Sequence, residues 1–339
     1  MRQVVIPRPG PPEVLTVQEV PTPVPSEGEV LIRVKAAGLN FADILARQGI
    51  YPDAPPMPCV VGYEVAGIVE KTGTGVERVK EGDEVIAMTR FRGQAEFVVV
   101  KEVQCFPKPA SLSMEKAAAL PVNYLTAYGL LVAMGSLHPG ETVLIHNAGG
   151  GVGLAAIDIA RHIGAKTIGT ASSWKHDFLK QRGIDAVIDY RQEDWFPRVM
   201  EITNGRGVEL IIDPIGGKHW KKSYQALRTT GRLGMFGISS AASAGGGFRK
   251  LRMLKTALSM PFFHPLSLLD KNRAVFGLNL GHFWHEAEKV SRWVKHLLEG
   301  VEKGWINPYV DKIFPFEEAA QAHRYLEERK NIGKVIMTP

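Results

Sequence analysis

Short apolar runs separated by turn residues fill the first 120 positions of the chain. The runs at 30–35, 65–69, 84–87 and 96–100 are rich in Val and Ile, and Gly, Pro and Asp stand between them. This pattern predicts a compact β domain. From residue 115 onwards the apolar positions recur at helical spacing, which predicts helices at 115–120 and 125–134.

Strands and helices are predicted to alternate after residue 142. The predicted strands are 143–146, 166–170, 186–189, 208–213 and 231–236, and the predicted helices between them are 154–163, 175–182, 196–203 and 218–227. Short links between such elements are typical of βαβ units, so we expect a parallel, doubly wound sheet. The rest of the chain predicts a strand at 274–280, helices at 286–303 and 316–330, and a strand at 333–337.

The composition narrows the class of protein. A chain of 339 residues with 45% hydrophobic content is long enough for two domains with buried cores. A net charge of +6, spread over the chain, does not indicate a nucleic-acid partner. The two cysteines, Cys59 and Cys105, cannot form a disulfide framework. With no apolar run of about 18 residues and no signal-like N-terminus, we expect a cytoplasmic protein.

A glycine-rich loop joins the strand at 143–146 to the helix that follows. Ala148, Gly150 and Gly153 form an Ala-x-Gly-x-x-Gly variant of the dinucleotide fingerprint. Gly150 would let the backbone approach a pyrophosphate, Gly153 would let the helix pack closely, and the N–H groups at the helix start favour an anion. The alternative interpretation is an ordinary glycine turn.

The segment about 20 residues after this loop indicates which dinucleotide is bound. An NAD site would place a carboxylate there, but the residues from Thr170 to Lys175 contain none. The hydroxyl of Ser172 and the ammonium of Lys175 suit the 2′-phosphate of NADPH. Alternatively, Ser172 only caps the next helix and Lys175 is solvated.

Several segments along the chain resemble zinc-free quinone oxidoreductases of the medium-chain dehydrogenase/reductase superfamily. They include residues 36–43 (AAGLNFAD), 122–128 (VNYLTAY), 188–191 (IDYR), 272–277 (NRAVFG) and 330–335 (KNIGKV). The similarity is greatest to the vesicle amine transport protein branch. It implies a GroES-like β-rich domain, residues 1–122 completed by 282–339, around an inserted Rossmann domain at 123–281.

The resemblance also implies positions for the cofactor, NADPH. Asn40 and Thr126 would lie near the nicotinamide and its ribose, and Gly150, Gly151 and Val152 at the pyrophosphate. The 2′-phosphate would lie among Ser172, Lys175 and Tyr190, and the nicotinamide half would follow Phe236, Gly237, Leu278 and Asn279. Some relatives add a C-terminal arginine to the phosphate site, and the corresponding region here offers Asn331 and Lys334.

Zinc ligands are missing from the positions where alcohol dehydrogenases of this superfamily carry them. Asn40 stands in the first motif, and the second motif reads Gly62, Tyr63, Glu64 without a histidine. A catalytic zinc needs three protein ligands, so we expect no metal. The pair His282 and His285 has helical spacing that more often faces solvent.

Chemistry without a metal favours an electron-poor acceptor. We expect hydride transfer to a small hydrophobic quinone or conjugated enone, where the developing negative charge delocalises. Asn40 could orient the substrate or the nicotinamide, and Tyr51, Tyr63 and Tyr124 could donate a proton; each tyrosine could equally serve only packing. An enoyl-thioester reductase and an NADPH-binding, lipid-contacting regulatory protein remain open.

One segment does not fit a minimal reductase. Residues 249–269 join a basic cluster, Arg249, Lys250, Arg252 and Lys255, to an apolar stretch broken by two prolines. It could cover the substrate site or a dimer surface, contact anionic lipid weakly, or pack as plain core. The resemblance implies a homodimer formed through the strand at 274–280.

Overall fold

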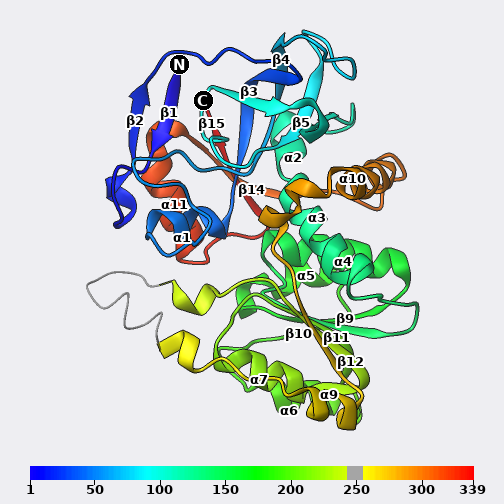
Figure 1. The fold of residues 1–339 in the computed structure, drawn as a ribbon. Helices are drawn as coiled ribbons and strands as arrows, with labels where there is room; N and C mark the ends of the chain where they lie inside the picture. Colours follow the sequence, from blue (N-terminus) through cyan, green and yellow to red (C-terminus); the bar gives the residue numbers. More distant parts are fainter. Residues whose placement is uncertain (243–254) are drawn as a thin grey trace. The chain divides into compact units, whose positions relative to one another are not determined.

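The computed structural model describes residues 1–242 and 255–339, which form two compact units (Figure 1). The first unit comprises Met1–Leu125 and Gly281–Pro339, and the second comprises Thr126–Leu280. Helix α3 (Pro121–Tyr128) belongs to both, because the boundary falls within it. The predicted class, a GroES-like β-rich unit combined with a Rossmann-like unit, is confirmed.

A seven-stranded sheet organises the first unit, in the order β14-β15-β3-β4-β5-β7 with β6 also paired to β3. Its strands are β3 (Glu29–Leu39), β4 (Glu64–Thr72), β5 (Glu84–Met88), β6 (Phe97–Lys101), β7 (Cys105–Pro107), β14 (Val310–Pro315) and β15 (Lys334–Thr338). Strands β1 (Arg2–Val5) and β2 (Thr16–Glu19) form a separate antiparallel pair. The last strand in sequence, β15, therefore lies inside the sheet, between β14 and β3.

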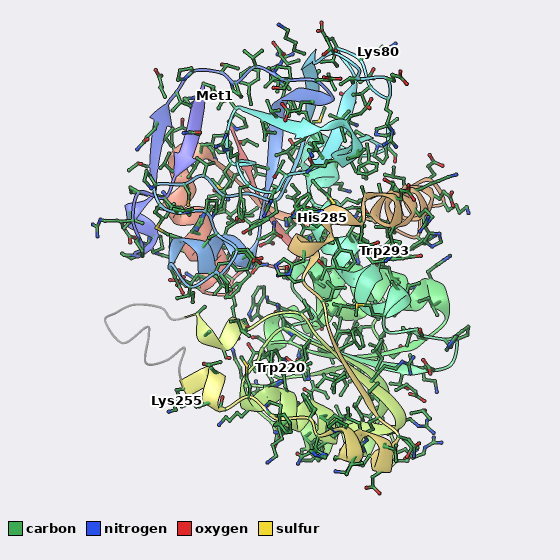
Figure 2. The ribbon with its side chains drawn as sticks, viewed as in Figure 1. Met1, Lys80, Trp220, Lys255, His285 and Trp293 are labelled. Atoms are coloured by element: carbon green, nitrogen blue, oxygen red, sulfur yellow. The ribbon has the colours of Figure 1, made fainter. Side chains whose placement is uncertain are left out.

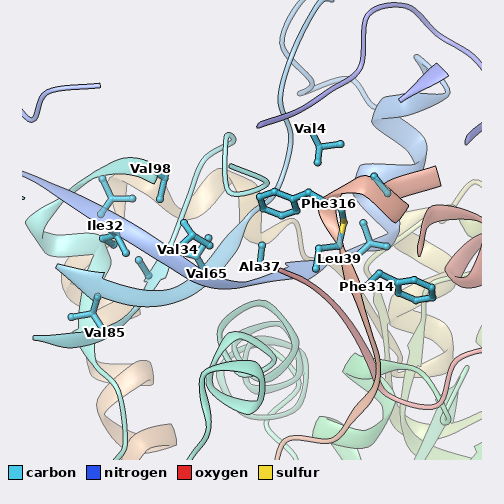
Figure 3. Packing of buried hydrophobic residues seen from close by; sticks show 14 of the residues in the cluster. Val4, Ile32, Val34, Ala37, Leu39, Val65, Val85, Val98, Phe314 and Phe316 are labelled. Carbon is cyan, nitrogen blue, oxygen red and sulfur yellow. The ribbon is translucent and has the colours of Figure 1, made fainter. Parts of the chain in front are cut away.

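The core of the first unit combines residues from both chain segments. Ile32 and Val65 project from neighbouring strands, and Phe314 and Phe316 come from the C-terminal segment (Figure 3). The helices of this unit, besides the start of α3, are α1 (Phe41–Arg47), α2 (Met114–Ala118), α10 (Ala287–Glu302) and α11 (Ala319–Glu327). Helix α11 makes contacts with α1, β14 and β15.

A six-stranded parallel sheet forms the second unit, in the order β10-β9-β8-β11-β12-β13. The strands are β8 (Thr142–His146), β9 (Lys166–Thr170), β10 (Ala186–Ile188), β11 (Val208–Asp213), β12 (Leu227–Met235) and β13 (Ala274–Gly277). The helices are α4 (Gly151–Ile163), α5 (His176–Gln181), α6 (Trp195–Ile202), α7 (Lys218–Gln225) and α9 (Pro265–Lys271). The predicted doubly wound sheet is confirmed, and its strand order reverses between β8 and β11.

Some predicted boundaries are wrong. The strand predicted at 274–280 ends at Gly277, and a 3-10 helix follows at Leu280–His285. The helix predicted at 316–330 starts as a 3-10 turn, Phe316–Glu318, and α11 ends at Glu327. Strands β1, β2 and β14 and helices α1 and α9 were not predicted, because they are short and carry polar or proline residues that weaken the apolar pattern.

Candidate active site

The glycine loop of the second unit connects β8 to α4 at the switch point of the sheet. Asn147 has a left-handed backbone (φ 56°), and Gly150 precedes the first helical residue. A Cβ on Gly150 would lie 2.7 Å from Asn147 Nδ2, and one on Gly153 would lie 2.4 Å from Ala148 O. Gly153 is therefore required by the nearby backbone, whereas a side chain on Gly150 would displace that of Asn147. The first N–H groups of α4 form the anion-binding end of a helix.

Lys175 lies against this loop. Its side chain is only 5% exposed, and a Cβ on Gly149 would come within 2.6 Å of Lys175 Cδ. The ammonium stands 4.8 Å from the centre of the exposed Trp174 ring. The lysine predicted to bind the 2′-phosphate and the loop predicted to bind the pyrophosphate are thus neighbours.

A carboxylate holds together the two segments that carry Ser172 and Tyr190. Asp189 accepts hydrogen bonds from the N–H of Ser173 at 3.1 Å and from the N–H of Arg191 at 2.9 Å. Burial opposes ionisation, but these two hydrogen bonds keep the pKa of Asp189 below its usual range. Ser172 is buried and Tyr190 is 37% exposed. The two residues whose hydroxyls are predicted to bind the 2′-phosphate therefore lie on two segments that Asp189 holds together.

The residues predicted for the nicotinamide half lie at the carboxyl ends of adjacent strands. Phe236 and Gly237 follow β12, and Leu278 and Asn279 follow β13. The N–H of Leu278 donates to Met235 O at 2.9 Å, which keeps the two strand ends together. Ligands of doubly wound sheets bind at such carboxyl ends. Thr126 is buried in α3.

In the first unit, Asn40 belongs to a buried polar cluster. Lys334 Nζ donates to Asn40 Oδ1 at 2.7 Å and forms an ion pair with Glu64 Oε1. Asn40 Nδ2 donates to Glu64 Oε1 at 3.0 Å, and the other carboxylate oxygen of Glu64 accepts the N–H of Val122 at 2.7 Å. Lys334 is 3% exposed and Glu64 is fully buried. The ammonium predicted as a phosphate ligand is engaged in this cluster.

A second carboxylate lies beside the cluster. Asp43 is fully buried and accepts the N–H groups of Asn40 at 2.8 Å and Gly62 at 3.1 Å. Burial raises the pKa of Asp43 to about 7, against the effect of those hydrogen bonds and of the Lys334 charge. The backbone segments that carry Asn40 and Tyr63 are therefore joined through one side chain.

The three candidate tyrosines differ in their surroundings. The rings of Tyr51 and Tyr63 meet edge to face at 6.2 Å, and Phe91 packs on Tyr63 at 5.4 Å. The Tyr63 hydroxyl is buried and has no hydrogen-bond partner among the residues that the structure describes. Burial, followed by the charge of Asp43, raises the pKa of Tyr63 well above its usual value, so this hydroxyl keeps its proton. Tyr124 is buried in α3.

Asn331 stands close to Lys334 in sequence and serves the turn before β15. The side chain is buried, and its Nδ2 donates to Gly333 O at 2.7 Å. The amide thus supports the backbone that delivers Lys334 into the cluster. Asn331 and Lys334 belong to the first unit, whereas Ser172, Lys175 and Tyr190 belong to the second.

Potential metal ligands also gather in the second unit. Within residues 1–242 and 255–339, the one group of His, Cys, Asp or Glu with suitable spacing is His146, Asp213 and His219. These side chains already form a hydrogen-bonded network, because Asp213 Oδ2 accepts His219 Nδ1 at 2.6 Å and Ser223 Oγ at 2.7 Å. Thr170 Oγ1 lies 3.0 Å from His146 Nδ1. These hydrogen bonds satisfy buried polar groups at the carboxyl ends of β8 and β11, which accounts for the cluster.

The apolar segment is described from Lys255 onwards (Figure 2), and Arg249, Lys250 and Arg252 lie outside the described residues. Leu258 is 78% exposed and Phe262 is 86% exposed, and Leu266 and Leu269 are also exposed. Phe263 and Leu268 instead pack on the core of the second unit. Plain core is therefore a wrong interpretation of this segment. No helix in the described parts of the chain is both long and apolar enough to span a bilayer.

Residue-level reasoning missed Glu64 and Asp43. Glu64 directly precedes the apolar run at 65–69, and Asp43 stands three residues after Asn40 in the pattern of a capping box. The first is a charged residue at a buried strand position, which signals a partner elsewhere in the chain. The second could have been found from the helix-start signal alone.

Comparison with known proteins gives consistent matches along the chain. Residues 182–337 match the family described as zinc-binding dehydrogenase, and residues 26–110 match the alcohol dehydrogenase GroES-like domain. The chain is 42% identical over 318 residues to the synaptic vesicle membrane protein VAT-1 homolog of Rattus norvegicus, covering 94% of this chain and 78% of that protein.

Solved structures extend the similarity to the whole fold. The quinone oxidoreductase of Escherichia coli complexed with NADPH is 32% identical, with a TM-score of 0.87 and coverage of 100% of both chains. CurK enoyl reductase is 28% identical, with a TM-score of 0.85 and coverage of 99% of this chain and 98% of that chain.

Proposed function

The chain belongs to the medium-chain dehydrogenase/reductase superfamily, in the branch of the VAT-1 proteins and quinone oxidoreductases, and from this premise we propose that it transfers hydride from NADPH to a quinone or conjugated enone without zinc. The observation that carries the proposal is the contact between Lys175 and the glycine loop.

The second unit fits NADPH by its own geometry. Gly150 carries no side chain directly before α4, so a pyrophosphate can approach the backbone N–H groups there, and Gly153 lets the helix pack close to Ala148. Lys175 places a positive charge beside that loop, and Ser172 and Tyr190 add hydroxyls on segments joined by Asp189. This set recognises a 2′-phosphate better than a 2′-hydroxyl.

The donor set around Asn40 does not fit a catalytic zinc. The matched region 182–337 contains no cysteine, and the motif position before Glu64 is Tyr63. Glu64 itself is neutralised by the ammonium of Lys334. A catalytic zinc needs three protein ligands, and the two carboxylates here are already engaged, Glu64 with Lys334 and Asp43 with the N–H groups of Asn40 and Gly62.

Catalysis would then depend on positioning and on a protonated hydroxyl. NADPH, when bound, supplies the hydride. The buried Tyr63 hydroxyl can donate a hydrogen bond to the carbonyl oxygen on which negative charge develops. Its raised pKa keeps it protonated, and the rings of Tyr51 and Phe91 pack against the Tyr63 ring and hold it in place.

Two measurements test the proposal. Purified protein is mixed with NADPH and a panel of quinones and enones, and the absorbance of NADPH is followed; no oxidation above background across the panel would reject the activity. For the cofactor, Lys175→Ala is expected to reduce the preference for NADPH over NADH about tenfold or more, because a charge-assisted hydrogen bond is lost. An unchanged ratio of the two affinities would reject the assignment of Lys175.

Reduction of an enoyl thioester is the second candidate activity. The similarity to CurK enoyl reductase favours it, and the same hydride transfer to a conjugated carbon would apply. Activity on a crotonyl thioester that exceeds activity on quinones would select this alternative.

The exposed apolar segment favours association with a partner. We assign Leu258, Phe262 and the free edge of β13 to a homodimer surface, because β13 pairs only with β12 in the described sheet. Light scattering measures the mass in solution, and the mass of a dimer is expected.

A monomer that sediments with anionic vesicles would instead select the weak membrane contact proposed for residues 249–269. NADPH binding without turnover would select the regulatory role.

A further inference from the structure

A chain of buried hydrogen bonds crosses the carboxyl ends of three adjacent strands in the second unit. Thr170, His146 and Asp213 are the last residues of β9, β8 and β11, and all three are buried. Thr170 Oγ1 lies 3.0 Å from His146 Nδ1. Ser223 Oγ, from helix α7, lies 3.3 Å from His146 Nε2 and 2.7 Å from Asp213 Oδ2. The four side chains therefore form one continuous chain.

The hydrogens of this chain point in one direction. Burial opposes ionisation of Asp213, but the hydrogen bond from His219 keeps the pKa of that carboxyl below its usual value, so it only accepts. Ser223 donates its one hydrogen to Asp213 and must accept from His146 Nε2. Burial lowers the pKa of His146 to about 3, so the ring is neutral and carries one hydrogen. His146 Nδ1 therefore accepts from the Thr170 hydroxyl.

This direction excludes a nucleophilic role for Ser223. A serine nucleophile needs a base that takes its proton, and here the neighbouring imidazole donates to the serine instead. Ser223 is also fully buried. The chain is therefore structural in its chemistry, and its position has to explain why it is polar.

The chain lies where the backbone pairing of the sheet ends. The register between β8 and β9 ends at the pair His146 and Thr170. The register between β8 and β11 ends one residue earlier, at Ile145 and Ile212. Beyond these pairs the strands separate at the switch point, and side chains take over the lateral hydrogen bonding from the backbone.

The predicted cofactor-binding loops leave the sheet at these same residues. The glycine loop follows His146, and the segment that carries Ser172 and Lys175 follows Thr170. Asp213 O accepts the N–H of Phe236 at 3.3 Å, which connects the end of β11 to the residues predicted for the nicotinamide half. The chain thus reaches the bases of all three predicted subsites within the second unit.

We propose that Thr170, His146 and Ser223 are positioning residues that set the spacing of the cofactor-binding loops. Thr170 aligns the 2′-phosphate segment with the glycine loop, and Ser223 aligns the glycine loop with the ends of β11 and β12. The inference rests on the proposed function, since it needs a bound dinucleotide. Apolar side chains could fill these positions without the cost of burying polar groups, but they would not fix the distance between the strand ends.

The test compares three ligands on the full chain. NADH lacks the 2′-phosphate, 2′,5′-ADP lacks the nicotinamide half, and NADPH has both. Thr170→Val is expected to weaken NADPH and 2′,5′-ADP about threefold to tenfold, as for one lost hydrogen bond, and to leave NADH within about twofold. Ser223→Ala is expected to weaken NADPH and NADH by the same factor and to leave 2′,5′-ADP within about twofold.

Two control variants separate alignment from general damage to the fold. Thr170→Ser keeps the hydroxyl and is expected to retain the affinities of the wild type. Thr203→Val removes a hydroxyl that donates to Val199 O at 2.8 Å at the end of α6, and it is expected to change none of the three affinities.

The remaining outcomes are also decisive. Wild type that binds none of the ligands rejects the proposed function and the inference together. Wild type that binds NADPH, with both variants showing the same ligand pattern or no effect, rejects the inference alone. If a variant does not fold, nitrogen NMR of the wild type labelled at histidine decides, with the His146 signal identified by its loss in His146→Gln. We expect the Nε2–H tautomer at neutral pH, and an Nδ1–H tautomer would overturn the chain and the inference.

Discussion

Replacing Gly38 with alanine tests how tightly the buried cluster is packed. Gly38 lies in β3, and its Cβ would come within 2.5 Å of Glu64 Oε1, 2.7 Å of Glu64 Cγ and 2.7 Å of Lys334 Cε. Such separations are shorter than those that real Cβ atoms show. The ion pair must therefore move, although it has no exposed side to move into, since Lys334 is 3% exposed and Glu64 is fully buried.

The size of the effect follows from three contributions. Overpacking of a filled core costs about 1–3 kcal/mol. Separating a buried pair costs about 3–5 kcal/mol when one charge loses its partner completely. Alanine restricts the unfolded chain and returns about 0.4–1 kcal/mol, because Gly38 does not need a left-handed backbone. With the pair strained but not fully separated, we expect Gly38→Ala to lower the free energy of unfolding by about 2–4 kcal/mol.

Urea unfolding followed by circular dichroism measures this difference, with Gly277→Ala as the matched control. Gly277 ends strand β13, and the nearest atom to its Cβ would be Met235 O at 3.8 Å, an ordinary contact. The control is expected to change the free energy of unfolding by less than about 1 kcal/mol. Equal stability of Gly38→Ala and Gly277→Ala would refute the packing argument, and with it the claim that the pair has no room to shift.

Three further predictions concern single side chains. Tyr63→Phe is expected to lower kcat/KM for the best acceptor about 100-fold while the affinity for NADPH stays unchanged; equal activity would remove the hydroxyl from the mechanism. Burial lowers the pKa of His146 to about 3, so the stability of the second unit falls as the pH drops from about 6.5 towards 3, by up to about 1.4 kcal/mol per pH unit. Urea midpoints at pH 7 and 5 check this, and His146→Gln should reduce the slope. Arg182→Met removes the buried ion pair with Asp158 and should cost about 3 kcal/mol, whereas removing the exposed Arg198 should cost less than about 1 kcal/mol in the same assay.

The second unit was the more predictable part of the fold, because its signals are local in sequence. The glycine loop, the apolar strand before it and the helix after it lie within about 20 residues, and Gly164 ends α4 in the left-handed conformation expected of a helix stop. Lys175 follows at a fixed distance after the loop, so its neighbourhood with Gly149 could be inferred from the order of the elements.

The cluster in the first unit had no such local signal. Glu64 and Lys334 are 270 positions apart, and Asn40 and Lys334 are 294 positions apart. Periodicity and motif spacing cannot predict contacts between residues so far apart in sequence, because these contacts depend on β15 pairing with β3 in the sheet. The sequence therefore predicted Asn40 and Lys334 as cofactor-site residues, but neither Glu64 nor the contact that joins the three side chains.

The placement of β15 also has a consequence for biosynthesis. This strand is synthesised after the whole second unit, and yet it lies between β14 and β3 in the seven-stranded sheet. The second unit is contiguous in sequence and can fold while the rest of the chain is still being made, as domains generally do. The N-terminal strands must wait with an open sheet edge at β3, and a chain that stops before residue 334 lacks both the strand that pairs with β3 and the positive charge that neutralises Glu64.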